Sequence, residues 1–275
     1  MHTLEDIERK RRLAVAEHDN TVSNFERDYA DLKKDRYSSA FTYARSRLHP
    51  RLESYLRAVP PGSRILDVGC GAGEQIKMYR DLGLEAVGVE PAPHMREVAQ
   101  RSNPGVSILQ GTVLDIPLPD QSFDVVVAIE VLRYLDPADW NRAFSEILRV
   151  LRPGGRLLVT MRNRYALDGF FFYDRLRKFV LGALGREPRV YHEFTTPVQV
   201  QRKLSAAGAQ NVTCFGNLFA PLILAYKISP AWAGRMARSL ETLDDALSGQ
   251  DWYAPFAVQL VVSARRAPSS ATGAG

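Results

Sequence analysis

The stretch "ILDVGCGAGE", residues Ile65–Glu74, decides the fold. An apolar strand pattern runs here into glycines at alternate positions, Gly69, Gly71 and Gly73. Glycine permits a tight turn and leaves main-chain N–H groups open to a ligand, because it has no Cβ atom to screen them. Ligands of open α/β sheets bind at the carboxyl ends of the strands. The stretch therefore predicts a strand, a ligand-binding turn and the start of a helix.

Strand and helix patterns alternate after this turn. The strand patterns are "EAVGVE", "VSILQG", "FDVVVAIE" and "RLLVTM", and the helix patterns between them include "PHMREVAQRS" and "PADWNRAFSEILRVL". Such alternation is typical of an α/β fold, here a Rossmann-like, doubly wound and mostly parallel sheet. Two later strand patterns, "NVTCFG" and "FAVQLVVSARR", extend the sheet, and the last strand is expected to be antiparallel.

Helical segments flank and interrupt the predicted sheet. Residues 1–58 form an N-terminal helical segment, and residues 59–266 form one domain with helical insertions at about 163–195 and 218–250. Residues 267–275 are small and polar, which indicates a disordered tail. In the first insertion, apolar side chains share one face of an amphipathic helix and basic side chains lie beside it: Phe172, Leu176, Phe179, Val180 and Leu184, beside Arg175, Arg177 and Lys178.

Composition narrows the class of protein. The 275 residues are 45% apolar and 24% charged, as in an ordinary soluble globular protein. The N-terminus lacks the apolar core of a signal peptide, and the longest apolar stretches fall short of the ~18 residues that a membrane span needs. The two cysteines, Cys70 and Cys214, are too few for a disulfide framework or a zinc cluster. We therefore expect a cytoplasmic monomer or homodimer without a transmembrane segment. Its net charge of +5 could attract an anionic substrate, a nucleic acid or a lipid surface at the membrane periphery.

Acidic residues around the glycine turn select its ligand. The dinucleotide fingerprint GxGxxG needs glycine at position 74, but Glu74 stands there and would repel a pyrophosphate at the helix N-terminus. No Gly-Lys-Ser/Thr follows, so the turn is not a Walker phosphate loop. Glu90 closes the second strand, where an acid can accept both hydroxyls of a ribose, and Asp67 adds negative potential. The sequence therefore favours a cationic adenosine cofactor without phosphates.

Four stretches in order resemble the successive motifs of class I S-adenosylmethionine-dependent methyltransferases. They are "ILDVGCGAGE", "GVEPAPHM", "GTVLDIPLPDQSFDVVVAIEVLRYL" and "ILRVLRPGGRLLVT", within about residues 58–162. The resemblance is to the type 11 group that includes the ubiquinone and menaquinone methylases. It implies S-adenosylmethionine as cofactor, S-adenosylhomocysteine as product, and residues 1–58 as a lid. It also implies that no metal is used, because Arg162-Asn163 replaces the Asp-Asn pair of the metal-dependent catechol enzymes.

The resemblance implies a cofactor role for individual residues. Glu90 would hold the ribose hydroxyls, and Cys70 would fill the space between glycines. Thr112 stands where resembling enzymes commonly carry an acid, so Asp115 is the alternative contact for the adenine amino group. The other residues are named by the part they would meet: Asp67, Gly69 and Gly71 for the methionine; Pro91, Met95, Thr112 and Val113 for the adenine; Ile129 and Glu130 for the reaction centre; Tyr29 and Tyr37 as aromatic residues of the lid.

Methyl transfer needs a base only where the acceptor loses a proton. The candidates are His192, near a predicted helix start; His18, in the lid; Glu130, after the fourth strand; and Tyr134, where resembling enzymes often carry a histidine. The aromatic stretches "GFFFYDRLRKFV" and "NLFAPLILAY" favour a partly hydrophobic small-molecule acceptor, such as a natural product or a quinone-like or lipid-linked metabolite, methylated on O, C or N. "IEVLRY" does not match the motifs of nucleic-acid methylases, so no nucleic-acid acceptor is expected.

Two other functions fit the same sequence. A nicotinamide-dependent oxidoreductase uses the same kind of sheet and would bind NAD rather than S-adenosylhomocysteine. A non-catalytic cofactor-binding protein would use the inserted helices as an interface for a partner. Cofactor binding and a methyl-transfer assay distinguish the three.

Overall fold

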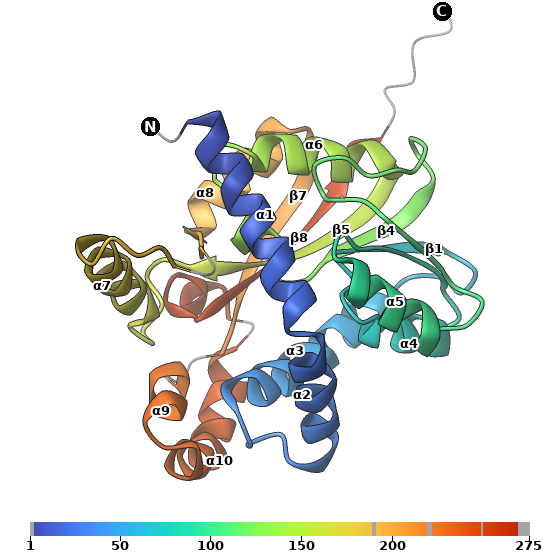
Figure 1. The fold of residues 1–275 in the computed structure, drawn as a ribbon. Coiled ribbons are helices and arrows are strands. Elements are labelled where there is room, and N and C mark those ends of the chain that lie inside the picture. Colours follow the sequence, from blue (N-terminus) through green and yellow to red (C-terminus); the bar gives the residue numbers. More distant parts are fainter. Residues whose placement is uncertain (1–2, 189–190, 219–221, 249, 269–275) are drawn as a thin grey trace, which may run out of the picture.

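The computed structural model describes residues 3–188, 191–218, 222–248 and 250–268, which form one sheet with helices on both faces (Figure 1). The strand order is β3-β2-β1-β4-β5-β8-β7, and the short β6 pairs with β5. Neighbouring strands are parallel except at β8, which is antiparallel to both β5 and β7. This confirms the predicted Rossmann-like α/β fold with an antiparallel last strand. The strands are β1 Arg64–Val68, β2 Glu85–Val89, β3 Ser107–Leu109, β4 Phe123–Ala128, β5 Leu151–Asn163, β6 Phe194–Thr195, β7 Ala209–Asn217 and β8 Gln259–Arg266.

Five helices cover the sheet: α3 Ala40–Arg57, α4 Glu74–Asp81, α5 Pro93–Ser102, α6 Trp140–Val150 and α8 Pro197–Ala206. On one face, Leu66 and Val126 pack with α6 and α8. On the other face, Ile65 and Val125 pack with α3, α4 and α5. Successive residues of β1 and β4 thus enter opposite cores, as in a doubly wound sheet. Because both faces are covered, the carboxyl ends of the parallel strands are the edge left for a site.

The N-terminal segment lies over that edge. Before α3 come α1 Leu4–Asn20 and α2 Val22–Lys34, and the 3-10 helix η1 Leu132–Tyr134 follows β4. Helix α1 crosses the molecule between α5 and η1 (Figure 1). The buried Lys10 ammonium lies 2.9 Å from Asp136 Oδ2, and Asp19 Oδ1 accepts the His94 N–H at 2.6 Å. Helix α1 is therefore tied to the segment after η1 and to the first turn of α5. This is the position expected of a lid, whose movement stays a prediction.

Both predicted insertions contain helices, and these helices pack differently. The first contains α7 Phe170–Ala183; the second contains α9 Leu222–Ile228 and α10 Pro230–Leu247, and the 3-10 helix η2 Asp251–Phe256 follows it. Helices α9 and α10 pack on α3, where the Tyr43 hydroxyl donates to Asp244 Oδ2 at 3.0 Å. Helix α7 instead projects from the body (Figure 1). The side chains of Phe172 and Phe179 on this helix are exposed to solvent.

Residues 269–275 of the predicted tail lie outside the described residues. Among the helices of the described part of the chain, none combines the length and apolar character that crossing a bilayer requires.

Candidate cofactor and acceptor site

The turn after β1 has a backbone that favours glycine. Gly69 and Gly71 have φ values of +71° and +55°, which side chains with a Cβ atom rarely adopt. A Cβ at Gly69 would lie 2.4 Å from Val131 Cγ2, whereas a Cβ at Gly71 would meet no described atom within 4 Å. The main chain at Gly71 therefore faces open space, which suits a ligand lying close to the backbone.

That open space belongs to a cavity of about 800 Å³, within the range of small-molecule sites. The lid, the glycine turn and the ends of β2 and β4 line it together. It collects all the predicted cofactor and catalytic residues except Tyr37: Tyr29, Asp67, Gly69, Cys70, Gly71, Glu90, Pro91, Met95, Thr112, Val113, Ile129 and Glu130, with His18, Tyr134 and His192.

Tyr37 does not line the cavity, so its predicted contact with the cofactor is not found. Its hydroxyl donates to Glu241 Oε2, and its ring stacks 6.0 Å from the Tyr43 ring. Tyr37 is thereby held against α10. An aromatic residue in a lid can face either the ligand or the neighbouring helix, and here its bond to the partly buried Glu241 turns Tyr37 toward α10.

Glu90 joins the end of β2 to the glycine turn. Its Oε2 accepts the Gly71 N–H at 2.8 Å, and its Oε1 accepts the Ala92 N–H at 2.9 Å. Burial raises the pKa of Glu90, while these two hydrogen bonds oppose that shift. A carboxylate has about four lone-pair sites, so it can accept two further donors such as vicinal hydroxyls. Glu90 thus shapes the turn as well as offering acceptors to a ligand.

Asp67 and Arg45 place opposite charges near the methionine end of the predicted cofactor site. Asp67 is buried and accepts the Tyr79 hydroxyl at 3.2 Å, and burial raises its pKa to about 7. The Arg45 guanidinium of α3 lies 5.4 Å from the Phe41 ring and 6.0 Å from the Tyr29 ring. Its buried Nη1 has no hydrogen-bond partner in the described part of the chain. A ligand with an ammonium group could pair with the Asp67 carboxylate, and a ligand carboxylate could accept a hydrogen bond from Arg45 Nη1.

An apolar wall lies beside Glu90 in the same cavity. Met95 is buried and packs with Ala72 and Val98. Thr112, at the place where resembling enzymes carry an acid, is engaged in its own turn, since its Oγ1 accepts the Leu114 N–H at 3.2 Å. Asp115, which bridges to Thr112, is the acid that this turn brings to the cavity. An apolar wall with one acid suits a purine that carries an amino group.

Glu130, just after β4, is held by three residues. Its N–H donates to Thr160 Oγ1 at 2.7 Å, Gln259 Nε2 donates to its Oε1 at 2.5 Å, and Arg133 donates to its Oε2. Burial alone would raise the pKa of Glu130, but Arg133 and Arg162 hold it well below its ordinary value. Because the carboxylate stays ionised and is already bonded, Glu130 is an anchor for Arg133 rather than a proton acceptor.

His192 lines the cavity and is held by Arg133. Arg133 Nη2 donates to His192 Nδ1 at 3.1 Å, and a guanidinium can only donate. The proton of the neutral ring is therefore on Nε2, an assignment from the hydrogen-bond partner. Burial, Arg133 and Arg162 together lower the pKa of His192 to about 2. His192 is thus a hydrogen-bond donor and not a base.

His18 has the opposite arrangement. Its Nδ1 lies 2.7 Å from the Ala14 carbonyl oxygen, which can only accept, so Nδ1 carries the proton and Nε2 keeps a lone pair. Burial lowers the pKa of His18, which keeps the ring neutral. The ring contacts Tyr134 edge-on, with 4.6 Å between centroids. Among the four predicted catalytic residues, His18 has the geometry of a proton acceptor.

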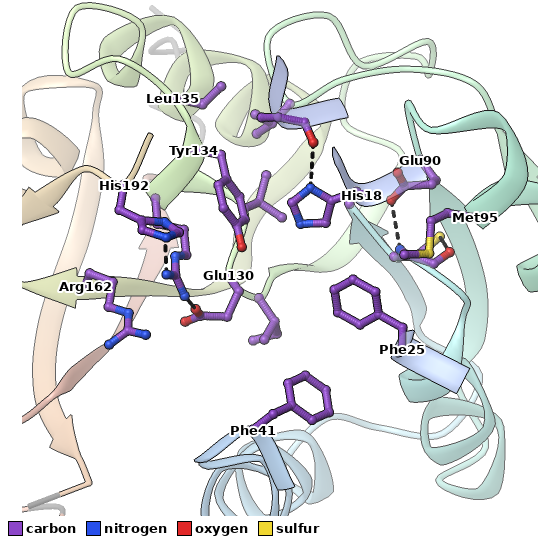
Figure 2. Close-up of a pocket in the computed structure, with 18 of the residues that line it drawn as sticks. His18, Phe25, Phe41, Glu90, Met95, Glu130, Tyr134, Leu135, Arg162 and His192 are labelled. Atoms are coloured by element: carbon purple, nitrogen blue, oxygen red, sulfur yellow. Dashed lines mark hydrogen bonds and ion pairs between the residues drawn. The ribbon is translucent and has the colours of Figure 1, made fainter. Parts of the chain in front are cut away.

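Figure 2 shows His192, Arg162 and Glu130 on one side of the cavity, Glu90 and Met95 on the other, and His18 between them. The sequence predicted no role in the site for Arg133 or Arg162, which lie on the same side of the cavity as His192. Arg162 is the next-to-last residue of β5, and its guanidinium lies 4.9 Å from the Phe170 ring. Its ion pair with Asp168, at 3.8 Å, is too long for a hydrogen bond, and burial lowers its pKa to about 10. A charged residue at the carboxyl end of an apolar strand was the signal that could have found it.

Comparison with known proteins identifies the family. The model of a methyltransferase domain matches residues 66–159, from β1 to β5. The ubiquinone biosynthesis O-methyltransferase of Azorhizobium caulinodans is 31% identical over 61% of this chain and 67% of its own length. The chain belongs to the class I S-adenosylmethionine-dependent methyltransferases. This confirms the resemblance found in the sequence, and S-adenosylmethionine is the cofactor that the family implies.

Other relatives cover less of the chain or share only the fold. An uncharacterised methyltransferase of Mycobacterium tuberculosis is 41% identical over 37% of this chain and 40% of its own length. The chain thus spans about two fifths of the length of the first curated relatives it matches. The solved S-adenosylmethionine-dependent methyltransferase of Thermotoga maritima has a TM-score of 0.58 at 19% identity, covering 90% of this chain and 97% of that one. The Archaeoglobus fulgidus structure has a TM-score of 0.54 at 18% identity, covering 81% and 94%. These two structures support the fold alone.

Proposed function

We propose that this methyltransferase transfers the methyl group of S-adenosylmethionine to an oxygen atom of a small, partly hydrophobic acceptor with an acidic hydroxyl or carboxyl group. The observation that carries the proposal is the pair of histidines that line one cavity: within the described ranges, His18 Nε2 keeps its lone pair and His192 Nε2 carries the ring proton. The relatives include O-methyltransferases of ubiquinone biosynthesis and of malonyl-[acyl-carrier protein].

The acidic end of the cavity suits the cofactor. When bound, S-adenosylmethionine supplies a methyl group on a positively charged sulfur, which leaves as a neutral thioether. Glu90 accepts the ribose hydroxyls with its remaining lone pairs, and Gly71 lets the ligand approach the main chain. Asp67 and Arg45 bind the ammonium and carboxylate groups of the methionine part through charge-assisted hydrogen bonds.

The cationic end suits the acceptor. Arg162 and Arg133 give this end of the cavity a positive potential, which is also why the pKa of His192 is low. The same potential favours the ionised form of a phenol or a carboxylic acid. Arg162 and the Nε2–H of His192 orient that oxygen for in-line attack. Such orientation is where an enzyme of this kind gains much of its rate.

His18 takes the proton when the acceptor is a hydroxyl that is still protonated. It lies on α1, so a closed lid brings the base to the cavity and excludes water at the same time. A carboxylate acceptor needs no base, and His18 would then be dispensable. The role of His18 therefore distinguishes the two acceptor classes.

Calorimetry with S-adenosylhomocysteine and with NAD tests the cofactor first. Release of S-adenosylhomocysteine is then measured with pairs of candidate acceptors. Each pair consists of an aromatic or fatty acid and the amide of that acid, and the series includes acids with and without a hydroxyl group. We expect turnover of the acids but not of the amides. We also expect a loss of about tenfold or more in kcat/KM for Arg162→Gln, because a hydrogen bond to a charged group is removed. Arg57→Gln, an exposed arginine on α3, is the matched control.

Each contrary result has a distinct meaning. Binding of NAD without S-adenosylhomocysteine would refute the methyltransferase activity and favour the oxidoreductase. Binding of S-adenosylhomocysteine with no turnover on any acceptor would favour a non-catalytic cofactor-binding protein. Turnover of amides as fast as acids, unchanged in Arg162→Gln, would refute the acidic acceptor.

A further inference from the structure

Helix α7 exposes a continuous apolar face. Phe172, Leu176, Phe179 and Val180 recur at helical spacing, and their exposed fractions are 73%, 63%, 75% and 46%. We call these four residues the α7 face. Contiguous exposed apolar surface of this kind marks a site of interaction with a protein or a membrane. The helix packs on the body of the protein through its other side, where Phe170 is buried. The α7 face therefore takes no part in covering the sheet.

The exposed apolar surface continues beyond α7. Lys227 Nζ lies 5.0 Å from the Tyr173 ring, which brings the end of α9 with the 82% exposed Ile228 beside α7. On the loop before α7, the Leu167 N–H donates to the Phe256 carbonyl at 3.2 Å, and both side chains are exposed. Three elements distant in the sequence therefore contribute apolar side chains to the same region.

The charges beside the α7 face are positive. The helix has one acid, Asp174, which is buried and lies 2.7 Å from Lys178 Nζ. At about 100° per residue, Arg175 borders the α7 face on one side and Arg177 lies beyond it on the other. The exposed side of α7 thus combines an apolar stripe with cations and has no exposed acid of its own.

A basic recess lies along one side of the helix, between Phe171 and Phe179. Its volume is about 420 Å³, and it shares His192 with the lining of the cofactor cavity. Arg164 and Arg175 both place their guanidinium groups 5.9 Å from the Phe171 ring. The buried Arg164 Nε has no hydrogen-bond partner within the described ranges. The charged side chains that line the recess are Arg164, Arg175, Lys178, Asp174 and Glu193. Since Asp174 is paired with Lys178 and Glu193 lies 3.7 Å from Lys10 Nζ, the two arginines are left to meet an anion.

We infer that the α7 face and the basic recess dock this protein on an anionic phospholipid surface. The apolar side chains enter the acyl boundary, and Arg164 and Arg175 meet lipid phosphates. Helices that lie in a membrane interface have this composition, with Phe and Leu on one side and Lys or Arg beside them. The positive flanks select a negatively charged bilayer over a neutral one.

Docking by this face orients the acceptor end of the cofactor cavity toward the bilayer. Phe170 at the start of α7 and Lys227 of α9 both line that cavity. A hydrophobic acceptor dissolved in the bilayer then has a short path to Arg162 and His18. This consequence rests on the proposed function, whereas the docking itself does not.

Vesicle flotation with the full chain tests the proposal. We expect flotation with vesicles of phosphatidylcholine and phosphatidylglycerol, little with phosphatidylcholine alone, and release by high salt. The double variant Phe172→Ser/Phe179→Ser should partition at least about tenfold less, because two exposed phenyl rings no longer enter the interface. Arg164→Gln/Arg175→Gln should lose about fivefold per charge with the mixed vesicles.

Matched controls separate docking from folding. Val198→Ser removes an exposed apolar side chain from α8, and Arg57→Gln removes an exposed arginine from α3; both should float like the wild type. Every variant should bind S-adenosylhomocysteine with unchanged affinity and show the same circular dichroism.

Three outcomes would overturn the docking proposal. They are failure of the wild type to float with the mixed vesicles, equal flotation with neutral vesicles, and unchanged flotation of the double Phe variant. Sedimentation velocity identifies another occupant: a wild-type dimer that Phe172→Ser/Phe179→Ser dissociates, without vesicle binding, would assign the face to a second copy of the chain. If the wild type floats but does not bind S-adenosylhomocysteine, the proposed function fails and the docking stands.

Discussion

Removing the Glu90 carboxylate should have a large effect on cofactor binding. In Glu90→Ala, the N–H groups of Gly71 and Ala92 lose the acceptors that they reach at 2.8 and 2.9 Å. The buried Ala92 donor left unsatisfied costs about 1–3 kcal/mol, whereas the Gly71 donor faces the open cavity and costs less, so unfolding should become easier by about 1–3 kcal/mol. A ribose loses a charged acceptor for two hydroxyls, each bond worth about 1.5 kcal/mol or more, so the Kd of S-adenosylhomocysteine should rise about 100-fold.

Calorimetry with S-adenosylhomocysteine and denaturant unfolding of the free protein measure the two effects separately. Glu90→Gln keeps one carbonyl acceptor and should lie between wild type and Glu90→Ala in both. Asp115→Ala is the control, because it removes a carboxyl from the same cavity without touching the glycine turn. The reasoning is refuted if Glu90→Ala binds S-adenosylhomocysteine within about threefold of wild type, or if Asp115→Ala has the larger effect.

Three further predictions concern the lid and the histidines. His18→Gln should lower kcat about 100-fold on a hydroxyl acceptor and remove the loss of kcat/KM below pH 6.5 that protonation of His18 causes, measured as a pH–rate profile. Lys10→Met should cost about 3 kcal/mol locally, because it breaks a buried ion pair, and speed limited proteolysis within α1; an unchanged cleavage rate would contradict this. Burial first, then neighbouring arginines, lower the pKa of His49 to about 4 and of His192 to about 2. The unfolded state therefore binds more protons below pH 6.5, and stability should fall by about 1–2 kcal/mol per histidine on going to roughly pH 5. The raised pKa of Asp67 opposes part of this loss, and a flat denaturation profile from pH 7 to roughly 5 would contradict it.

The parts of the site that sequence could predict are local. The glycine turn, Glu90 and the alternation of strands and helices each lie within a short stretch, so spacing alone fixes their geometry. Arg45 and Arg162 were missed because their role depends on contacts between distant elements. The donor role of His192 depends on Arg133, which lies 59 positions away in the chain. Sequence could name His192 as a candidate but could not assign its tautomer.

For α7, the sequence predicted the helix but could not predict whether its apolar face is buried or exposed. The amphipathic pattern of Phe172, Leu176 and Phe179 predicted a helix with one apolar face, and the helix is there. The pattern alone left open whether that face covers the sheet. It does not, because α6 and α8 already fill that side of the sheet with Phe144 and Leu204. The boundaries of the lid and insertions, the cytoplasmic location and the oligomeric state stay predictions.

The charge distribution along the cavity gives the proposed reaction a direction. Asp67 and Glu90 outnumber Arg45 at the cofactor end, whereas Arg133 and Arg162 outnumber Glu130 at the acceptor end. The acidic excess attracts a sulfonium cation, and the basic excess attracts an ionised oxygen. Methyl transfer between them neutralises both charges, so each end loses its electrostatic attraction for its product. Substrates are therefore drawn to opposite ends of one cavity before the reaction and held less strongly after it. The same argument predicts that raising the ionic strength weakens S-adenosylmethionine binding more than S-adenosylhomocysteine binding, which paired titrations at low and high salt would measure.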